Sequence, residues 1–469
     1  MKKNIFLILV LGLILRFVVI NQSFWLDEAI GALVVKNQTF WQILTEFPKY
    51  DFHPPLYYLT LKLWSSLFGY SEIALRTPSV LFGIGTLYLV YKIGKIFNER
   101  VGLIASILLA TSQFHIYYSQ EARMYSMAAF LAALAFYFFI KENWKYFSLA
   151  TFGLVFTDYM PVFLLPVFWL IGVVSKKSKD WWKKLALSHL PLIILGILWL
   201  PIFLAQSQGG KLLLEALPAW AKIAGGATPK QVGLVWAKFV LGRISFFNKA
   251  FYYLSLLIVS LPFGFLLIKA WSRRKKLVPI LLWFIVPLIL GFLVSILFPA
   301  FTYFRFLFVI PAFYLLLAWG SIHVHPTTRT ILVVLLLSVN IFTWLLYVFD
   351  ENQKREAWRQ AVGFVESRAK QEEMVVFNST EPFAPYQWYE KGKVKAMGLT
   401  DSVAANPLKT KEKTVSSVVD IKGVYYFEYL WELHDPLRVV ESSLKEAGFL
   451  EVYAFDFPGV GIVRYLKRI

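Results

Sequence analysis

Cysteine is absent from the 469 residues, and charged residues are scarce. Without cysteine the chain has no disulfide, no thiolate zinc site and no cysteine nucleophile. Only 16% of the residues are charged while 58% are hydrophobic, whereas soluble domains have about 25% charged and about 45–50% apolar residues. This composition excludes an ordinary soluble enzyme, a disordered chain and a collagen.

Acidic residues are few in the first three quarters of the chain. Residues 1–349 hold 31 Lys and Arg against 11 Asp and Glu, and residues 350–469 hold 17 against 18. The basic residues punctuate apolar runs, which favours anionic lipid headgroups over nucleic acid as their partner. We therefore predict a membrane domain over residues 1–349 and a soluble domain over residues 350–469.

Eleven apolar segments approach the length of roughly 17–25 residues that a membrane-spanning helix needs. They are 4–20, 79–97, 102–118, 124–140, 146–158, 160–174, 184–204, 250–270, 277–298, 303–321 and 330–349. With these spans, the basic clusters at the N-terminus, Lys141/Lys145, Lys176–Lys184 and Arg273–Lys276 all fall on one side. The positive-inside rule makes that side the cytoplasm of the cell membrane and makes the soluble domain extracytoplasmic. The first span is then an uncleaved anchor.

The outer segments and the tail have patterns of their own. Residues 21–78 form an outer loop with two amphipathic stretches, 27–46 and 55–68, and residues 205–249 form another with flexible breaks at Gly209-Gly210 and Gly225-Gly226. In the tail, we expect helices over 351–370 and 435–447. Strands are expected over 374–377, 423–427, 449–455 and 461–465, so the tail is a small α/β domain. Lys391–Lys395 and Lys409–Lys413 are expected to be exposed loops.

Charged residues gather at the outer ends of the spans. Asp27 and Glu28 follow the first span directly. They are either a general base with its neighbour or an acidic pair that favours a helix N-terminus. His53 precedes two prolines that start a helix, and it either donates to a phosphate or is an interfacial histidine. Asp158 fits a polar turn better than a cavity wall.

Three further charged side chains lie at predicted membrane depth on the outer side. Glu121 and Arg123 stand between the third and fourth spans, where charges are functional candidates unless they form a local ion pair. Arg305 stands among aromatic residues and either binds an anionic headgroup or extends to the interface. Arg16 allows the same two interpretations. His323 and His325 lack nearby carboxylates, so we expect no metal there, and the chain has no P-loop, nucleophile elbow or zincin motif.

Three motifs in the first 125 residues together resemble glycosyltransferase family 39. They are Ser23-Phe24-Trp25-Leu26-Asp27-Glu28, His53-Pro54-Pro55-Leu56-Tyr57-Tyr58 and Tyr118-Ser119-Gln120-Glu121-Ala122-Arg123-Met124-Tyr125. This family contains protein O-mannosyltransferase-like and aminoarabinose-transferase-like proteins of the GT-C superfamily. The chain is most similar to its prokaryotic branch of predicted membrane-bound mannosyltransferases. The resemblance is specific over residues 1–140 and mainly architectural in the tail.

The resemblance implies a polytopic α-helical membrane fold of GT-C type, with about 11 spans. It implies an inverting transfer of mannose or a related sugar from a polyprenyl-phosphate donor to an acceptor hydroxyl outside the cytoplasmic membrane. Asp27 matches the acidic residue usually assigned as the base, with Glu28 beside it, and His53 matches a phosphate-contacting position. Glu121 and Arg123 match the second outer motif. The family points to no metal and no cofactor, and the acceptor is a lipid, a glycan or a protein.

The chemistry of such a transfer fits the residues on the outer side. A phosphate leaving group departs as an anion, so it needs cationic stabilisation, and donors such as His53, Arg123 and Arg305 would stabilise the charge that grows on the phosphate. One carboxylate must accept the proton of the acceptor hydroxyl. Tyr57, with Trp25, Trp41 and Tyr58, either stacks on sugar and lipid or anchors the chain at the interface.

Two other functions remain open at this point. A transporter or flippase for lipid-linked glycans would use the same charges along a translocation path, and a membrane scaffold would use the tail for partners. A transporter predicts charges through the membrane midplane and an internal repeat, whereas these charges gather at the outer face. Replacing Asp27 with Asn distinguishes an enzyme from both.

Overall fold

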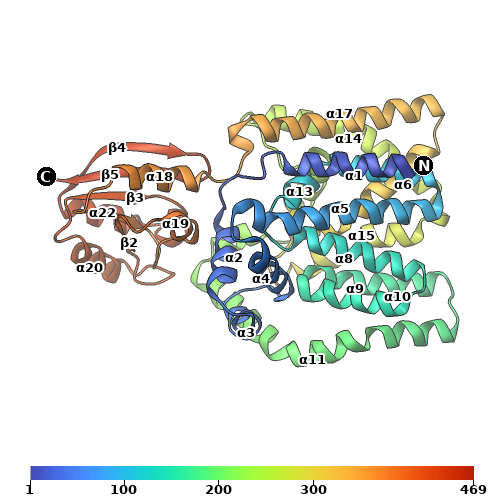
Figure 1. Cartoon of the computed structure of the whole chain (residues 1–469), viewed down its shortest axis with the longest axis horizontal. Coiled ribbons are helices and arrows are strands. Elements are labelled where there is room, and N and C mark those ends of the chain that lie inside the picture. Colours follow the sequence, from blue (N-terminus) through green and yellow to red (C-terminus); the bar gives the residue numbers. More distant parts are fainter. Residues whose placement is uncertain (1) are drawn as a thin grey trace. The chain divides into compact units, whose positions relative to one another are not determined.

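The computed structural model describes residues 2–469, and the contacts within the chain divide it into two compact units (Figure 1). Unit 1 comprises residues 2–20, Gln38–Ser207 and Ala224–Gln353. Unit 2 comprises Asn21–Asn37, Gln208–Ile223 and Lys354–Ile469. The tail therefore shares its unit with two segments of the predicted outer loops, and the domain boundary at residue 350 stays a prediction.

Unit 1 is built of helices, and its long helices run side by side (Figure 1). The α-helices are α1 (Lys2–Phe17), α3 (Phe40–Thr45), α4 (Leu56–Phe68), α5 (Glu72–Phe97), α6 (Glu99–Thr111), α7 (Gln113–Ser119), α8 (Tyr125–Ile140), α9 (Trp144–Thr157), α10 (Leu165–Val174), most of α11 (Lys179–Ala216), α13 (Pro229–Leu241), α14 (Lys249–Ser272), α15 (Val278–Val294), α16 (Ile310–Ile322) and α17 (Pro326–Phe349). Short 3₁₀ helices are η1 (Phe47–Lys49), η2 (Met160–Leu164), η3 (Arg274–Lys276), η4 (Tyr303–Val309) and η5 (Glu351–Gln353).

Five helices in the described residues are long and apolar enough to cross a membrane. They are Glu72–Phe97, Lys179–Ala216, Lys249–Ser272, Tyr303–Ile322 and Pro326–Phe349, and the bent pair α6–α7 is a sixth if it counts as one span. Tyr125–Ile140, Met160–Val174 and Val278–Val294 are apolar but shorter. These elements coincide with predicted apolar segments, while the total of eleven spans stays a prediction.

The predicted span over 102–118 is not one straight helix. The chain bends by 65° between α6 and α7. Ser112 leaves the helical conformation with a ψ of 114°, and its hydroxyl caps α7 by accepting the N–H of His115 at 3.4 Å. The bend redirects the motif Tyr118–Tyr125 of the sequence analysis and so decides where Glu121 and Arg123 point.

The amphipathic stretches of the first outer loop form short helices, as predicted. In unit 1, α3 and α4 lie across the end of the bundle opposite the N-terminus of α1, which shares its end with the basic turn between α10 and α11 (Figure 1). A capping box between Thr39 and Gln42 begins α3, and α4 follows Pro55 directly. The predicted break at Gly209-Gly210 is wrong, because both glycines continue α11.

Unit 2 contains a five-stranded sheet in the order β2-β1-β3-β5-β4. Its strands are β1 (Glu373–Phe377), β2 (Lys395–Gly398), β3 (Gly423–Phe427), β4 (Phe449–Phe457) and β5 (Gly461–Arg468), and its helices are α2 (Leu26–Asn37), α12 (Trp220–Ala224), α18 (Trp358–Arg368), α19 (Ala384–Tyr389), α20 (Pro407–Ser417), α21 (Trp431–His434) and α22 (Val439–Glu446). The strands β2, β1 and β3 are parallel, whereas β5 runs antiparallel to β3 and β4.

Helices cover both faces of this sheet because its central strands are buried on both sides. Side chains of α18 and α19 pack with Val375, Phe377 and Phe427 on one face, and those of α22 pack with Met374 and Val376 on the other. The α/β tail is therefore confirmed. The predicted loop over Lys409–Lys413 is wrong, because this segment lies within α20, where Asn406 accepts two backbone N–H groups at the cap.

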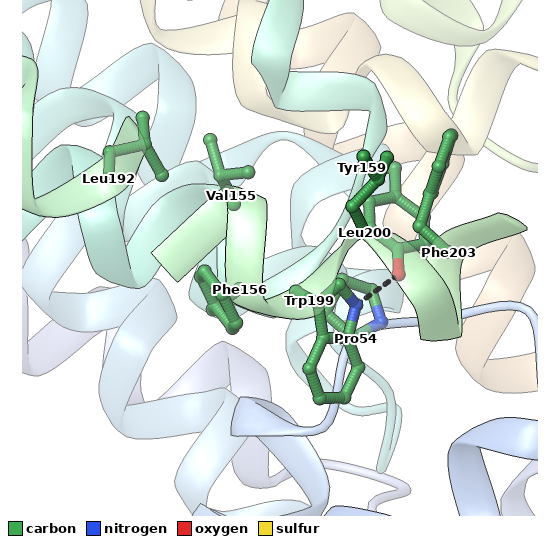
Figure 2. A pocket seen from close by; sticks show the side chains of 9 residues that line it. Pro54, Val155, Phe156, Tyr159, Leu192, Trp199, Leu200 and Phe203 are labelled. Atoms are coloured by element: carbon green, nitrogen blue, oxygen red, sulfur yellow. Dashed lines mark hydrogen bonds between the residues drawn. The ribbon is translucent and has the colours of Figure 1, made fainter. Parts of the chain in front are cut away.

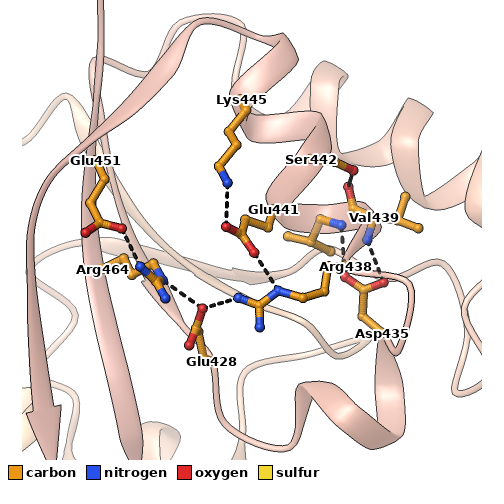
Figure 3. A network of polar contacts seen from close by, with 10 residues as sticks. Glu428, Asp435, Arg438, Val439, Glu441, Ser442, Lys445, Glu451 and Arg464 are labelled. Carbon is orange, nitrogen blue, oxygen red and sulfur yellow. Dashed lines mark hydrogen bonds and ion pairs between the residues drawn. The ribbon is translucent and has the colours of Figure 1, made fainter.

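A network of ion pairs connects β3, β5 and α22 of unit 2 (Figure 3). Arg438 bonds to both Glu428 and Glu441, and Arg464 bonds to Glu428 at 2.7 Å. Asp435 caps α22 by accepting the backbone N–H groups of Val439 and Val440 at 2.8 and 2.9 Å. These contacts join β3, β5 and α22 and have a structural role.

Candidate active site

A short loop between η1 and α4 carries His53 in unit 1. The ring nitrogen Nδ1 of His53 lies 3.3 Å from Oδ2 of Asp51, and both side chains are about 15% exposed. Burial raises the pKa of the Asp51 carboxyl, but the charges of His53 and Arg123 outweigh burial and hold it below the ordinary value. The loop thus presents an ionised carboxylate and a histidine side by side.

Asp158 caps the C-terminal end of α9 and lies in the electrostatic environment of residues from other segments. The charges that act on it come from His53, Arg305 and Arg123. Its Oδ1 accepts the backbone N–H of Met160 at 3.3 Å, so the predicted turn role is confirmed. Three predicted site residues therefore contribute to the electrostatic environment of a carboxyl group that is only 5% exposed.

Arg123 is held by Tyr58 of α4. Its Nη1 donates to the hydroxyl of Tyr58 at 2.9 Å, and it is 4% exposed. The neighbouring Tyr57 is 1% exposed, with its hydroxyl 3.3 Å from Ser79 Oγ. This burial shows that Tyr57 and Tyr58 connect α4 to the bundle.

Arg243 packs against the end of α7. Its guanidinium lies 4.4 Å from the ring centroid of Tyr117 and bonds to its hydroxyl, and Glu121 contributes a charge that acts on it. Glu121 is 1% exposed. This arrangement makes Arg243 an additional cation next to the predicted second motif.

Gly242 allows this approach of Arg243 to α7. Its φ is +76°, and a Cβ atom there would lie 2.1 Å from Oε1 of Gln113. The same Oε1 accepts the backbone N–H of Arg243 at 2.5 Å. Nearby, burial, together with the charges of Arg243 and a second lysine, lowers the pKa of Lys238 to about 8.

Asp27 and Glu28 begin α2 and belong to unit 2. Glu28 is fully buried, with its Oε2 3.9 Å from Nη1 of Arg355. Asp27 is partly buried and contributes to the electrostatic environment of Tyr429. The structure therefore gives Glu28 a buried ion-pair partner, and the catalytic roles of both carboxylates stay predictions.

Arg16 follows neither of its two interpretations. Its guanidinium is fully buried and bonds to Ser119 at 3.2 Å, to His115 Nδ1 at 2.6 Å and to the carbonyls of Gly12 and Ala110. These contacts lock α1 against α6 and α7. Arg16 is thus part of the interior of unit 1.

The sequence patterns did not identify Asp51, Arg243 or Arg355, the ion-pair partner of Glu28. A signal existed for two of them, because Asp51 stands two residues before His53, and Arg243 follows a glycine that ends an amphipathic helix. Arg355 gave no signal, since its pairing spans more than 300 residues. Among residues 2–469, no three His, Asp or Glu side chains form a group that could hold a metal ion.

Comparisons with known proteins agree with the motifs. Residues 52–204 match the family model described as "Dolichyl-phosphate-mannose-protein mannosyltransferase". A search of curated protein sequences finds no match. The matched region contains His53, Tyr57, Glu121, Arg123 and Asp158.

Solved structures share the fold of the whole chain at low sequence identity. ArnT from Cupriavidus metallidurans in the apo state has 12% identity and a TM-score of 0.63, covering 100% of this chain and 98% of that chain. The same protein bound to undecaprenyl phosphate gives a TM-score of 0.58 with 12% identity, covering 99% and 97% of the two chains. The oligosaccharyltransferase AglB from Archaeoglobus fulgidus, in complex with an inhibitory peptide and a dolichol-phosphate, has 12% identity and a TM-score of 0.51, covering 99% and 74%. The family match over residues 52–204 confirms the resemblance of this chain to glycosyltransferase family 39, and the solved structures show that its fold is shared with ArnT and AglB.

Proposed function

We propose that this protein is an inverting glycosyltransferase that moves mannose or a related sugar from a polyprenyl-phosphate donor to an acceptor hydroxyl. Its site is on the outer face of the cytoplasmic membrane, in a multi-pass chain with a cytoplasmic N-terminus and an extracytoplasmic tail. The observation that carries this proposal is that His53, Arg123 and Arg305 all act electrostatically on the buried carboxyl of Asp158, while Tyr58 holds Arg123 at 2.9 Å and Asp51 lies 3.3 Å from His53. A transporter or flippase has no comparable support, because the family model that matches residues 52–204 describes a mannosyltransferase.

His53, Arg123 and Arg305 suit the leaving group as hydrogen-bond donors. A sugar bound through a phosphate ester loses that phosphate as an anion, so no general acid is needed. Fixed cations in a site poor in water stabilise the charge that grows on the phosphate oxygens, and removal of one such donor costs about 10²–10³-fold in rate in other enzymes. Arg123 is already oriented by the hydroxyl of Tyr58, which reduces the cost of ordering it.

The proton of the acceptor hydroxyl must go to a base. We propose Asp27 for this role on the strength of its motif, and a base of this kind contributes about 10²–10⁴-fold. The hydroxyl oxygen then attacks the anomeric carbon as the bond to phosphate breaks, so one displacement inverts the configuration. The reaction balances without metal or cofactor, and neither is part of the proposal.

The test is transfer of radiolabelled mannose from polyprenyl-phosphate mannose to lipid and glycan extracts by purified protein in detergent. Asp27→Asn and Arg305→Gln should each lower transfer at least about 100-fold. Asp180→Asn and Arg273→Gln are matched controls, because both residues are exposed. Both controls should keep wild-type rates.

The outcomes separate class from mechanism. If wild-type protein is inert with mannose and with a panel of other polyprenyl-phosphate sugars, the proposed function is wrong. If wild-type protein transfers sugar and Asp27→Asn keeps full activity, the assignment of the base is wrong. In that case Asp158→Asn identifies whether the carboxylate among the cations performs this step.

A further inference from the structure

Gln206 is the anchor of the second half of α11 in unit 1. Within α11, all of which the structure describes, the residues buried are Trp181, Leu185, Ser188, His189, Leu192 and Gln206. The apolar part of this helix is otherwise outward-facing, since only 17% of its membrane-length window is buried. A glutamine amide that is 4% exposed must find polar partners to be stable there.

Those partners are backbone carbonyls of the loop that carries His53. The amide nitrogen of Gln206 donates to the carbonyl of Pro48 at 2.8 Å and to that of Asp51 at 2.9 Å. The carbonyl of His53 lies 3.4 Å from the same nitrogen. One side chain on a long helix therefore holds both ends of the segment that presents the Asp51–His53 pair.

The oxygen of the Gln206 amide is held by Tyr159, which is in turn bonded to Trp199; these two aromatic residues are called the relay below. The hydroxyl of Tyr159 donates to Oε1 of Gln206 at 2.6 Å, and it accepts the indole N–H of Trp199 at 2.8 Å. Burial raises the pKa of Tyr159 to about 12, so this hydroxyl keeps its proton. Tyr159 directly follows Asp158, so the relay reaches both segments of the candidate site.

The relay lines a small apolar crevice between α9 and α11 (Figure 2). Its volume is about 140 Å³, and Pro54, Phe156, Tyr159, Trp199 and Phe203 contribute to its walls. Figure 2 shows the bond from Trp199 to Tyr159 beside Pro54, which immediately follows His53. The apolar packing explains why the polar contacts of Gln206 stay out of water and keep their strength.

We propose that Gln206 is a positioning residue, which orients the Asp51–His53 loop for the phosphate of the donor through its bonds to the loop carbonyls. This inference rests on the proposed function. The positioning role explains why α11 has a buried amide at position 206, since no apolar side chain could donate hydrogen bonds to the carbonyls of Pro48 and Asp51. Loosening the loop weakens donor binding and leaves the acceptor untouched.

The test is Gln206→Met, which keeps the length of the side chain and removes its amide. The KM for the lipid-linked donor should rise about tenfold, the effect of one lost hydrogen bond of about 1.4 kcal/mol. The KM for the acceptor should stay within about twofold, and so should kcat. Gln208→Met is the matched control, because Gln208 is exposed on the same helix, and Tyr159→Phe should show a smaller rise than Gln206→Met.

Hydrogen exchange provides a second measurement that needs no activity. The peptide over residues 47–55 should exchange faster in Gln206→Met than in wild type and Gln208→Met. A purely structural fault would lower kcat through a smaller active fraction, leave both KM values unchanged and overturn the positioning role. Unchanged exchange together with unchanged donor KM would overturn the inference entirely. If wild-type protein transfers no sugar, the proposed function fails, and exchange alone still decides whether Gln206 holds the loop.

Discussion

The buried ion pair of Glu28 and Arg355 gives the sharpest test of whether Glu28 is structural or catalytic. Both side chains are at most 1% exposed, and their charged atoms are 3.9 Å apart. At an effective dielectric constant of about 20, the attraction at this distance is about 4 kcal/mol. Glu28→Gln leaves the guanidinium buried without this charge, and such a loss costs about 3–5 kcal/mol.

Thermal unfolding in detergent, followed by tryptophan fluorescence, measures this cost. For a unit of roughly 150 residues, about 3 kcal/mol lowers Tm by roughly 6–12 °C. Replacing both partners by apolar residues, Glu28→Leu with Arg355→Met, removes both charges and should restore Tm to near the wild-type value. The comparison of single and double variants isolates the pair.

Transfer activity of the double variant then decides the role of Glu28. If its stability and activity both recover, Glu28 acts only through the fold. If its stability recovers and transfer stays absent, the pair also has a chemical role. A Glu28→Gln protein with the wild-type Tm would refute the reasoning, because it would show that the buried charge is stabilised by other means.

Two further predictions follow from the loop and from the turn before Arg243. The pKa of Asp51 is held below its ordinary value of 3.8. The stability that its carboxylate contributes is therefore present above about pH 4 and is lost as pH falls through the lowered pKa. The Tm difference between wild type and Asp51→Asn should persist down to about pH 4 and close below it. Gly242→Ala should lower both Tm and the transfer rate, because the added Cβ would lie 2.1 Å from Gln113 and a φ of +76° is unfavourable for alanine. The expected cost in stability is about 1–3 kcal/mol. Gly233→Ala is the control and should match wild type, because a Cβ there meets no neighbour.

Local patterns in the sequence predicted much of the secondary structure. The apolar segments over 250–270 and 330–349 correspond to α14 and α17, since a run of apolar residues of this length forms a helix whatever its neighbours are. The strands over 374–377 and 423–427 match β1 and β3 for a similar reason, because short apolar β-branched and aromatic runs indicate buried strands. Ser112 was not recognised as a break, because its extended backbone is stabilised by a cap and by packing.

The sequence by itself determined the class of the chain and the candidate residues. Composition and charge spacing indicated a helical membrane region with a soluble tail. The motifs named His53 and Arg123, and the aromatic surroundings of Arg305 singled out that residue. Only the tertiary structure brought these three into the electrostatic environment of Asp158 and paired Asp51 with His53. It also joined Glu28 to Arg355 and Gln206 to the His53 loop. These contacts join residues that are distant in the sequence, by more than 300 positions for Glu28 and Arg355. They depend on helix bends and turn geometry that no local pattern encodes.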